Sequence, residues 1–312
     1  MSKIKTFLRL LFKDRMGLKI AIYNYKVKTG IYDRLSDADF LKKTFKVRFG
    51  KELNLDNPKT FNEKLNWLKI YDRKPLYNKM VDKFEAKEIV KDRIGKEYTV
   101  PTIGIYNSVD EIDFTNLPNR FAIKCTHDSG SVVICKNKNE LNVRKTKKFL
   151  KKHCKHNLFF WAREWPYKDV KPRIIVEEYI DSLDENLVVY KVFCFHGKPY
   201  LIQVIQNDKH KDETIDYFDT NWNLLDLKQD FPNSPNHLKK PKALEEMLQL
   251  SSLFLRERPF IRVDWYIVND RPIFSEFTFF SDAGFAFFSP NEWDIKLGNM
   301  MKLPSAKEGE EI

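Results

Sequence analysis

The most informative stretch of the chain lies near its C-terminal end: Ile261-Arg262-Val263-Asp264-Trp265-Tyr266-Ile267-Val268, then Asn269-Asp270-Arg271-Pro272, then Ile273-Phe274-Ser275-Glu276-Phe277-Thr278-Phe279-Phe280. Two β-branched and aromatic runs that flank a turn-forming cluster are typical of a β-hairpin. A turn centred on Asn269-Asp270-Arg271 places Asp264 nearly opposite Glu276, and Arg262 nearly opposite Thr278. Because side chains alternate between the two faces of a strand, these four residues are predicted to share one face.

The two carboxylates on that face repel each other unless something neutralises them. Carboxylate oxygens are usual ligands of hard cations, and Mg²⁺ that bridges nucleotide phosphates is the commonest case. One interpretation is therefore a metal site at Asp264 and Glu276. The alternative is a solvated hairpin face on which the carboxylates pair with Arg262 and a nearby lysine.

A second pair of apolar strands, residues 121–136, flanks a short polar loop. With the turn centred near Gly130, Lys124 and Lys136 are predicted to lie opposite each other on one face. Two facing lysines favour an anion between them, and the small residues Ser129, Gly130 and Ser131 let backbone N–H groups approach a phosphate closely. An ordinary hairpin with two exposed lysines is the alternative.

The rest of the chain alternates between helical and extended patterns. Thr60 and Glu63 form a capping-box pattern at the start of a helix, and a second helix is predicted from about Lys74 to Ile94, ended by Gly95. Basic residues 138–155 and residues 241–258 are also predicted to be helical. Strands are predicted at residues 172–180, 188–195 and 199–205, and the first of them ends in acidic residues.

Composition restricts the class of protein. The 312 residues suffice for two or three subdomains, and no apolar run reaches the ~18 residues that a membrane-spanning helix needs. Charges spread through residues 3–15 do not fit a secretory signal. The four cysteines have no paired spacing, which favours a reduced, cytosolic compartment. His153-Cys154-Lys155-His156 is interpreted as a solvated helix face, with a metal site as the alternative.

The formal net charge of +11 favours anionic partners such as nucleotides, acidic polymers or an anionic membrane. We expect no nucleic-acid partner, because the sequence has no zinc-finger pattern or RNA-binding aromatic signature. Residues 1–57 are basic and partly amphipathic. Their first helix could lie on the anionic inner face of the membrane or pack on the body of the protein, and the sequence does not choose between these.

The order of the elements resembles the ATP-grasp superfamily, including the D-alanine–D-alanine ligases: a lysine strand, a small-residue loop, a second lysine, a strand ending Glu-Glu-Tyr-Ile, an Arg-x-Asp strand and a Glu-x-Thr strand. Four runs look more closely like the TupA-like ATP-grasp family, whose members are encoded among bacterial surface-polysaccharide genes. These runs are Phe61-Asn62-Glu63-Lys64, Cys125-Thr126-His127-Asp128-Ser129-Gly130-Ser131, Arg163-Glu164-Trp165-Pro166-Tyr167 and Glu276-Phe277-Thr278-Phe279. The resemblance covers roughly residues 35 to 300.

The resemblance implies an α+β fold in which two subdomains clasp ATP. The implied divisions are a basic N-terminal region (1–57), a linker subdomain (58–120), a lid subdomain (121–180), a metal-binding catalytic subdomain (181–300) and a tail (301–312). The phosphates would be held by Lys124, Ser129, Gly130, Ser131 and Lys136. Adenine would contact Glu177, Glu178, Tyr179 and Ile180, and Asp184 or Glu185 would be candidates for the ribose.

The resemblance also implies the residues of the chemistry. Asp264 and Glu276 would bind Mg²⁺, with Thr278 at the position where relatives have an asparagine ligand. Arg262 would stabilise the charge that develops on an acyl phosphate, and Lys191 would reach the γ-phosphate.

Three functions follow as hypotheses. The first is an ATP- and Mg²⁺-dependent ligase that joins an amino acid or other amine to an acidic saccharide, such as a uronic acid, in a capsule or cell-surface polymer. The second is a glycosyltransferase that uses a nucleotide sugar. The third is a non-catalytic module that binds polysaccharide or membrane.

Overall fold

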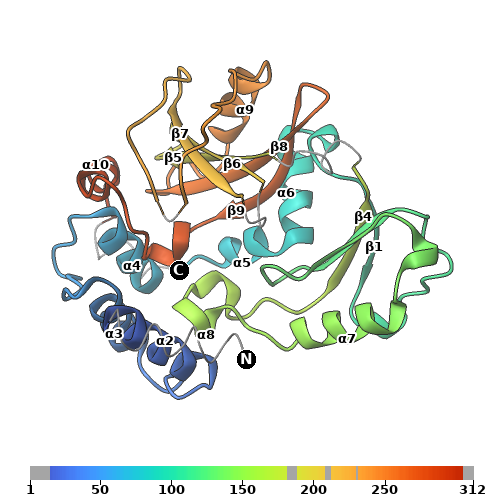
Figure 1. Ribbon diagram of the computed structural model, residues 1–312, viewed down its shortest axis with the longest axis horizontal. Coiled ribbons are helices and arrows are strands. Elements are labelled where there is room, and N and C mark those ends of the chain that lie inside the picture. The colour runs from blue at the N-terminus through green and yellow to red at the C-terminus, as the bar shows by residue number, and fades with distance from the viewer. Residues whose placement is uncertain (1–14, 181–187, 208–211, 230, 305–312) are drawn as a thin grey trace.

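The computed structural model describes residues 15–180, 188–207, 212–229 and 231–304, and it contains two antiparallel β-sheets surrounded by helices (Figure 1). The amphipathic segment at residues 1–14 lies outside the described residues, as do the ribose candidates Asp184 and Glu185. The two sheets and their helices confirm the predicted α+β class.

The smaller sheet has four strands in the order β1 (Thr102–Tyr106), β4 (Ile174–Glu178), β2 (Phe121–Cys125) and β3 (Val132–Cys135). Its apolar face packs with α7 (Val143–His153) to form a separate small core. The predicted linker of residues 58–120 contains β1, which pairs with β4. The division predicted at residue 120 therefore falls inside this sheet.

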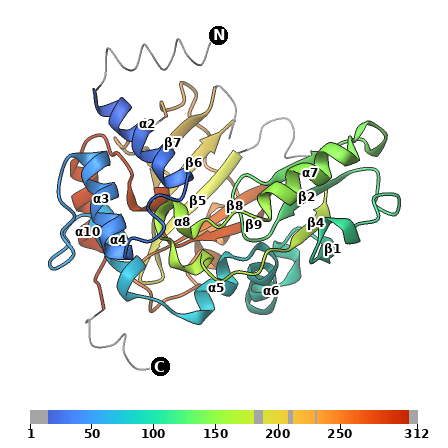
Figure 2. The same cartoon turned by 90° about the horizontal axis from the view of Figure 1, so that it is seen from below.

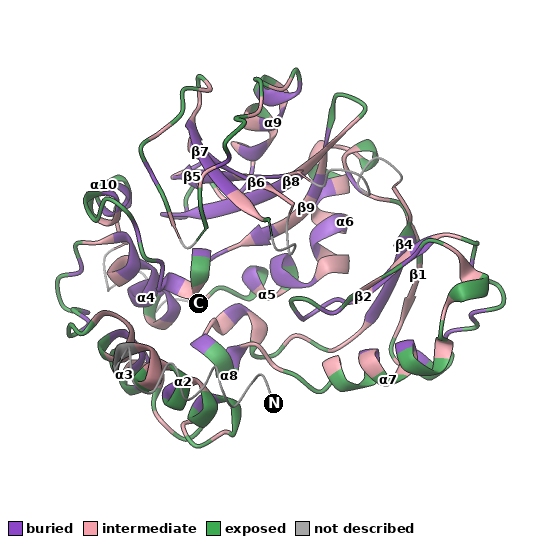
Figure 3. Cartoon of the chain, viewed as in Figure 1, coloured by how far each residue is buried: buried purple, intermediate pink, exposed green. Residues whose placement is uncertain are grey.

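The larger sheet has five strands in the order β7 (Thr214–Asp219), β6 (Lys198–Gln206), β5 (Val188–Phe195), β8 (Ile261–Val268) and β9 (Arg271–Thr278). Its side chains form the main core together with the helices near both ends of the described chain. Figure 3 shows that the central strands are mostly buried, whereas the helix surfaces alternate between buried and exposed positions.

The helices differ from the predictions mainly in their lengths. Besides α7 they are α2 (Arg15–Lys28), α3 (Asp37–Phe49), α4 (Phe61–Tyr71), α5 (Pro75–Val81), α6 (Lys83–Ile94), α8 (Phe159–Ala162), α9 (Leu244–Ser251) and α10 (Glu292–Met300). The capping box of Thr60 and Glu63 is confirmed at the start of α4. The single helix predicted from about Lys74 to Ile94 is wrong, because the Asp82 side chain accepts hydrogen bonds from the N–H groups of Phe84 and Glu85 and starts α6 anew.

The described part of the N-terminal region packs on the body of the protein. Tyr23 and Val27 of α2 are buried, and the Tyr23 hydroxyl is hydrogen-bonded to the Thr44 hydroxyl of α3, 2.5 Å away. Among the described residues, no helix combines the length and the apolar character needed to cross a bilayer.

Candidate functional site

The β8–β9 hairpin confirms the predicted pairing. Asp264 lies opposite Glu276 and Arg262 lies opposite Thr278. The turn itself has only two residues, Asn269 and Asp270, both in the left-handed region, as a tight primed turn requires.

A two-residue turn alone would give a register one residue away from the observed one, and a β-bulge restores it. Trp265 pairs with Phe274, but the next residue, Asp264, pairs with Glu276, so that Ser275 is the extra residue of β9. Without the bulge, Asp264 would face Ser275 and Glu276 would point to the opposite side of the sheet. The bulge therefore brings the two carboxylates onto one face.

Asp264 and Arg262 form a buried, bidentate ion pair. The Arg262 Nε and Nη2 atoms donate to the two Asp264 carboxylate oxygens at 2.7 and 2.8 Å, and the residues are 6% and 1% exposed. Arg262 also donates to the hydroxyls of Thr278 (3.0 Å) and Ser281 (3.1 Å). The pairing with Arg262 that the alternative interpretation requires is thus present, but the face is buried rather than solvated.

Lysines supply further positive charge to the same face. Lys191 lies opposite Asp264 on β5, with its Nζ 3.6 Å from the Asp264 carboxylate. Burial raises the pKa of Glu276, but the charges of Lys83, Lys191, Arg262 and Lys124 outweigh burial and lower it below its usual range. Glu276 is half-buried and, among the described residues, its carboxylate makes no hydrogen bond.

The β2–β3 hairpin differs from the prediction. Lys124 lies opposite Val132, and the pairing continues to Phe121 opposite Cys135, so the turn is centred on Asp128 rather than near Gly130. Lys136 follows the end of β3, at the far end of the hairpin from the loop, and is exposed. The two lysines therefore do not face each other. The prediction failed because the glycine is not at the centre of the loop.

Lys124 instead pairs with Glu177 on the neighbouring strand. Glu177 is 3% exposed and accepts from Lys124 at 2.6 Å and from Lys87 of α6 at 2.7 Å. Burial raises the pKa of Glu177, but the two lysines outweigh burial and lower it. Glu177 was predicted to contact adenine, whereas its carboxylate lies between two lysines that it can hold in place.

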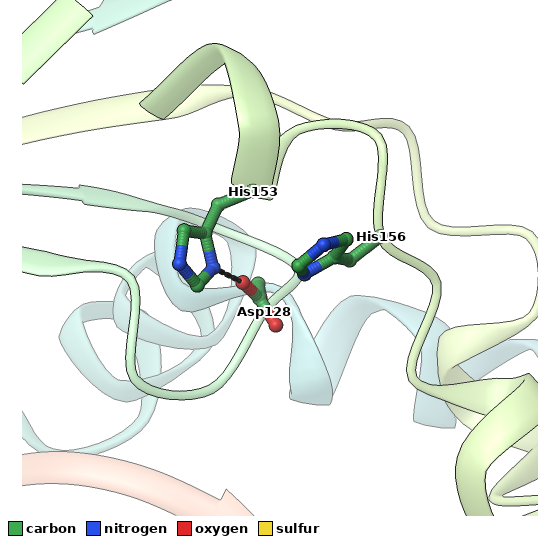
Figure 4. A group of neighbouring side chains, drawn as sticks. All are labelled: Asp128, His153 and His156. Atoms are coloured by element: carbon green, nitrogen blue, oxygen red, sulfur yellow. Dashed lines mark hydrogen bonds and ion pairs between the residues drawn. The ribbon is translucent and has the colours of Figure 1, made fainter. Parts of the chain in front are cut away.

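The loop between β2 and β3 is anchored at one side and open at the other. The buried Asp128 carboxylate bonds to His153 Nδ1 at the end of α7, beside His156 (Figure 4), and to the Ser129 N–H. The Asp128 carbonyl accepts from Lys83 Nζ at 2.6 Å. Ser129 and Gly130 are exposed, and Gly130 has a φ of +78° with open space around it.

Two other loop contacts fix its base and the neighbouring helix. The Ser131 hydroxyl is buried and accepts from the Cys125 N–H at 3.2 Å. The His153-Cys154-Lys155-His156 cluster contributes two histidines that, with Asp128, could hold a metal ion, since one ligand atom of each lies within 4.8 Å of the others. The hydrogen bond between Asp128 and His153 accounts for this closeness without a metal.

The strand end predicted to contact adenine is partly accessible. Glu178 closes β4 and is exposed, and its N–H donates to the Pro101 carbonyl. Tyr179 and Ile180 are half-buried, and the Arg120 guanidinium lies over the Tyr179 ring at 4.1 Å. These three residues thus lie at the C-terminal end of β4, which is an inner strand of the smaller sheet, and Glu178 is the exposed one of the three.

The structure adds charged residues that the sequence reasoning missed. Lys83 is the first residue of α6, where the helix dipole disfavours a cation, and burial lowers its pKa. That unfavourable position was a detectable signal. Because Lys83 acts electrostatically on both Glu276 and Lys124, it links the faces of the two sheets.

Glu164 and Lys69 form a second missed group beside Arg262. Burial raises the pKa of Glu164 and lowers that of Lys69. Lys69 Nζ donates to Asn66 Oδ1 and to the carbonyls of Ala162 and Ala283 at 2.7–3.1 Å. Glu164 belongs to a run quoted above for its family resemblance, but sequence spacing gave no reason to place it near the hairpin.

Several solved structures are distantly similar to this chain. The D-alanine–D-alanine ligase from Bacillus anthracis, solved with ATP, is 17% identical over 64% of this chain and 53% of its own, with a TM-score of 0.36. The D-cycloserine synthetase DcsG is 12% identical over 76% and 72%, with a TM-score of 0.41. The ATP-grasp ligase PsnB, solved with a minimal precursor, Mg and ADP, is 9% identical over 70% and 57%, with a TM-score of 0.35. The chain spans about half the length of the first of these ligases.

Similarity to structures at this level does not by itself establish a relationship. No protein with a curated description matches the chain. The sequence of residues 63–302, however, matches the family described as TupA-like ATPgrasp, and this match includes both sheets and every predicted site residue. The protein therefore belongs to the TupA-like ATP-grasp family, as the sequence resemblance indicated.

Proposed function

We propose that the protein is an ATP-dependent ligase that joins a carboxylate to an amine through an acyl phosphate, in the synthesis of a bacterial capsule or cell-surface polysaccharide. The observation that carries this proposal is the face shared by β5, β8 and β9. Two carboxylates and a hydroxyl lie there beside an arginine and several lysines: Asp264, Glu276, Thr278, Arg262, Lys191, Lys83 and Lys124.

The donor set on this face fits Mg²⁺. Asp264, Glu276 and Thr278 offer only oxygen atoms, which Mg²⁺ prefers. Glu276 has the carboxylate that is free of hydrogen bonds among the described residues, whereas the Asp264 carboxylate already binds Arg262. The surrounding cations disfavour an isolated metal ion but favour a metal–phosphate complex, so Mg²⁺ would bind with the nucleotide. When bound, it would neutralise phosphate charge during phosphoryl transfer.

The nucleotide would lie between the two sheets' polar faces. We assign its phosphates to Lys124 and to the loop of Ser129, Gly130 and Ser131, of which Ser129 and Gly130 are exposed, with Lys83 as an added contact. Adenine would contact Glu178, Tyr179 and Ile180 at the end of β4. The hairpin register removes the argument for Lys136 as a partner opposite Lys124, and Glu177 becomes a positioning residue for Lys124.

The reaction has two steps. A carboxylate oxygen of the acceptor attacks the γ-phosphorus, the bond from that phosphorus to the bridging oxygen breaks, and ADP leaves. The amine nitrogen then attacks the acyl carbon, the carbon–oxygen bond to phosphate breaks, and the nitrogen loses a proton. Arg262 is held by Asp264, Thr278 and Ser281 before substrate arrives, so it can stabilise developing negative charge without reorganising.

The net charge supports an acidic acceptor. A chain of +11 attracts an acidic saccharide, and a uronic acid supplies the carboxylate that the chemistry requires. We propose that the amine is an amino acid or a related small amine, and that the reaction occurs in the cytoplasm or at the inner face of the membrane.

The test is a screen for ADP and phosphate release over pairs of uronic acids and amines, with product mass as the second readout. We expect ADP only when both substrates are present, and its loss in Glu276→Gln. Glu245→Gln, at an exposed glutamate on α9, is the matched control and should retain activity. Release of a nucleoside diphosphate from a nucleotide sugar alone would establish a glycosyltransferase instead. Polysaccharide binding without any nucleotide turnover would establish a non-catalytic module.

A further inference from the structure

Two helices on one side of the molecule carry basic residues and no acidic ones. The 14 residues of α2 and the 11 residues of α7 include no aspartate or glutamate. On α7, Thr146 and Leu150 are buried, and the opposite face exposes a row of cations. Within the part of the chain that the structure describes, Lys148, Lys152 and Lys155 form no ion pair, whereas Lys151 pairs with Asp110.

Large apolar side chains are exposed beside these cations. On and after α2, Ile22, Tyr25 and Ile31 are 46%, 67% and 59% exposed, and on α8, Phe160 and Trp161 are 40% and 49% exposed. Single exposed apolar residues are ordinary, but a group of aromatic and aliphatic side chains next to unpaired lysines marks a surface that binds something.

Two hollows lie on this side of the molecule, and their lining residues meet in the sequence at Lys155 and His156. A shallow hollow of about 820 Å³ runs along α7 and ends at Lys155. The next residue, His156, lines a second hollow of about 280 Å³, together with Phe160, Trp161 and Lys28. Helices α2, α8 and α7 lie along the lower side of the molecule in Figure 1 and face the viewer in Figure 2. We call this surface the α2–α7–α8 face.

We propose that the α2–α7–α8 face docks the protein on a bilayer that contains anionic lipids. Lysine side chains would reach the phosphate headgroups, while Tyr25, Phe160 and Trp161 would sit at the boundary between headgroups and acyl chains. An acidic polysaccharide would also match the lysines, but it would gain nothing from Ile22 and Ile31. The aliphatic side chains therefore favour lipid. Asp33 lines the second hollow and Asp110 pairs with Lys151, so two acidic residues offset part of the positive charge of this face.

The test measures co-sedimentation of the full chain with vesicles of phosphatidylcholine, with or without phosphatidylglycerol. We expect binding to the anionic vesicles that weakens with salt. Replacing Lys148, Lys152 and Lys155 by glutamate should weaken it by more than about 100-fold, since each lost lysine near an anionic surface costs about fivefold and each added glutamate is repelled as well. Glutamate at the exposed residues Lys239, Lys240 and Lys242, which lead into α9 on the opposite side in Figure 1, is the charge-matched control and should bind nearly as the wild type does.

Two further variants separate lipid insertion from simple charge attraction. The double substitution Tyr25→Ser and Trp161→Ser should weaken binding while the net charge stays the same. Brominated acyl chains should quench tryptophan fluorescence in the wild type and much less in Trp161→Phe.

Three results would overturn the proposal. The first is equal vesicle binding by the α7 variant and its control, and the second is no binding of the wild type to anionic vesicles. The third is that the wild type binds a soluble polyuronate but does not bind vesicles. Circular dichroism and the unfolding midpoint of each variant confirm that the fold is intact. None of these measurements requires nucleotide, so the outcome does not depend on the proposed ligase activity.

Discussion

The β8–β9 and β2–β3 hairpins present their charged residues in different ways. In β8–β9, the predicted partners lie opposite each other, and Asp264 is bound by Arg262 in a buried position. In β2–β3, Lys124 and Lys136 lie at opposite ends of the hairpin, and Lys124 forms an ion pair with Glu177 on β4. The first hairpin thus holds the main partner of Asp264 within itself, with Lys191 of β5 and Lys83 of α6 adding positive charge, whereas Lys124 of the second finds its partner on β4.

This difference shows what determines a charged site in a sheet. In β8–β9, the two-residue turn and the bulge at Ser275 fix the register together. The three-residue turn assumed from the sequence gives the same pairing because it counts the extra residue in the turn instead of in β9. A longer loop leaves the register open, and a charged side chain then pairs with whichever partner the rest of the fold brings near. The comparison also shows that charge balance has to be counted over all neighbouring strands.

The largest effect is expected from the two carboxylates of β8–β9, which should behave differently from each other. Asp264→Asn leaves Arg262 buried without its counter-ion, which costs about 3 kcal/mol of unfolding free energy or more, and it should also abolish ADP formation. Glu276→Gln should abolish ADP formation at a cost of about 1 kcal/mol or less, because Glu276 is half-buried. Urea unfolding and ADP release measure the two effects.

Equal loss of stability in both variants would show that the Arg262–Asp264 pair is not the stabilising interaction. Equal ADP release by the wild type and Glu276→Gln would remove Glu276 from the proposed metal site.

The next largest effect is expected at Glu177 of β4, whose carboxylate pairs with Lys124 of β2. Glu177→Gln leaves Lys87 and Lys124 without their shared carboxylate and should cost about 3 kcal/mol at neutral pH. In the wild type, burial raises the pKa of Glu177 but the lysines lower it below its unfolded value, which is about 4.3. The contribution of Glu177 is therefore present above that value and is lost as the pH falls through the lowered pKa.

Urea unfolding of the wild type and of Glu177→Gln over a pH series checks the sign. We expect the difference in stability to be constant near neutral pH and to close below about pH 4. A difference that widens on acidification would contradict the assignment.

A smaller effect separates the two lysines of β2–β3. Lys124→Met should weaken ATP binding about tenfold or more, because a charged hydrogen bond to phosphate contributes roughly 1.5–3 kcal/mol. Lys136→Met should have a much smaller effect, since Lys136 lies at the other end of the hairpin from the loop. Calorimetric titration with ATP and Mg²⁺ measures both affinities. A larger loss of ATP affinity in Lys136→Met than in Lys124→Met would support the original prediction that both lysines bind the nucleotide.

The smallest effect is expected in the loop that follows β2. Gly130→Ala should cost about 1 kcal/mol, because φ is +78° while the added methyl group meets no neighbour. Gly50→Ala is the matched control, since its φ is +68° and it also has open space. Both should lose similar stability in thermal unfolding, and only Gly130→Ala should change ATP affinity. Unchanged ATP affinity in both variants would mean that the loop does not contact phosphate.

Features encoded within a few residues of one another were predictable from the sequence. The capping box at Thr60, the strands of β8–β9 and their shared face are of this kind. The break at Asp82 was also encoded locally, but a helix pattern on both sides concealed it.

Features that depend on distant residues were not predictable in this way. Lys87 and Glu177 are 90 residues apart in the sequence, and no spacing rule connects them. The position of Glu164 beside Arg262 likewise follows from how α8 and the following turn pack against the larger sheet. The family resemblance supplied the two-subdomain fold, which the local patterns alone left as an α+β arrangement of unknown connectivity.

The extra residue in β9 makes the length of the chain part of the site. The side chain of Ser275 is half-exposed and forms none of the described hydrogen bonds, so an exchange for another amino acid should be tolerated at that position. A deletion of Ser275 would remove the bulge but keep Glu276 opposite Asp264, because Glu276 would then follow Phe274 directly in a regular ladder. An inserted residue between the turn and Glu276 would instead need a second bulge or a longer turn to keep this pairing. The site should therefore tolerate the loss of one residue in this part of β9 better than the gain of one.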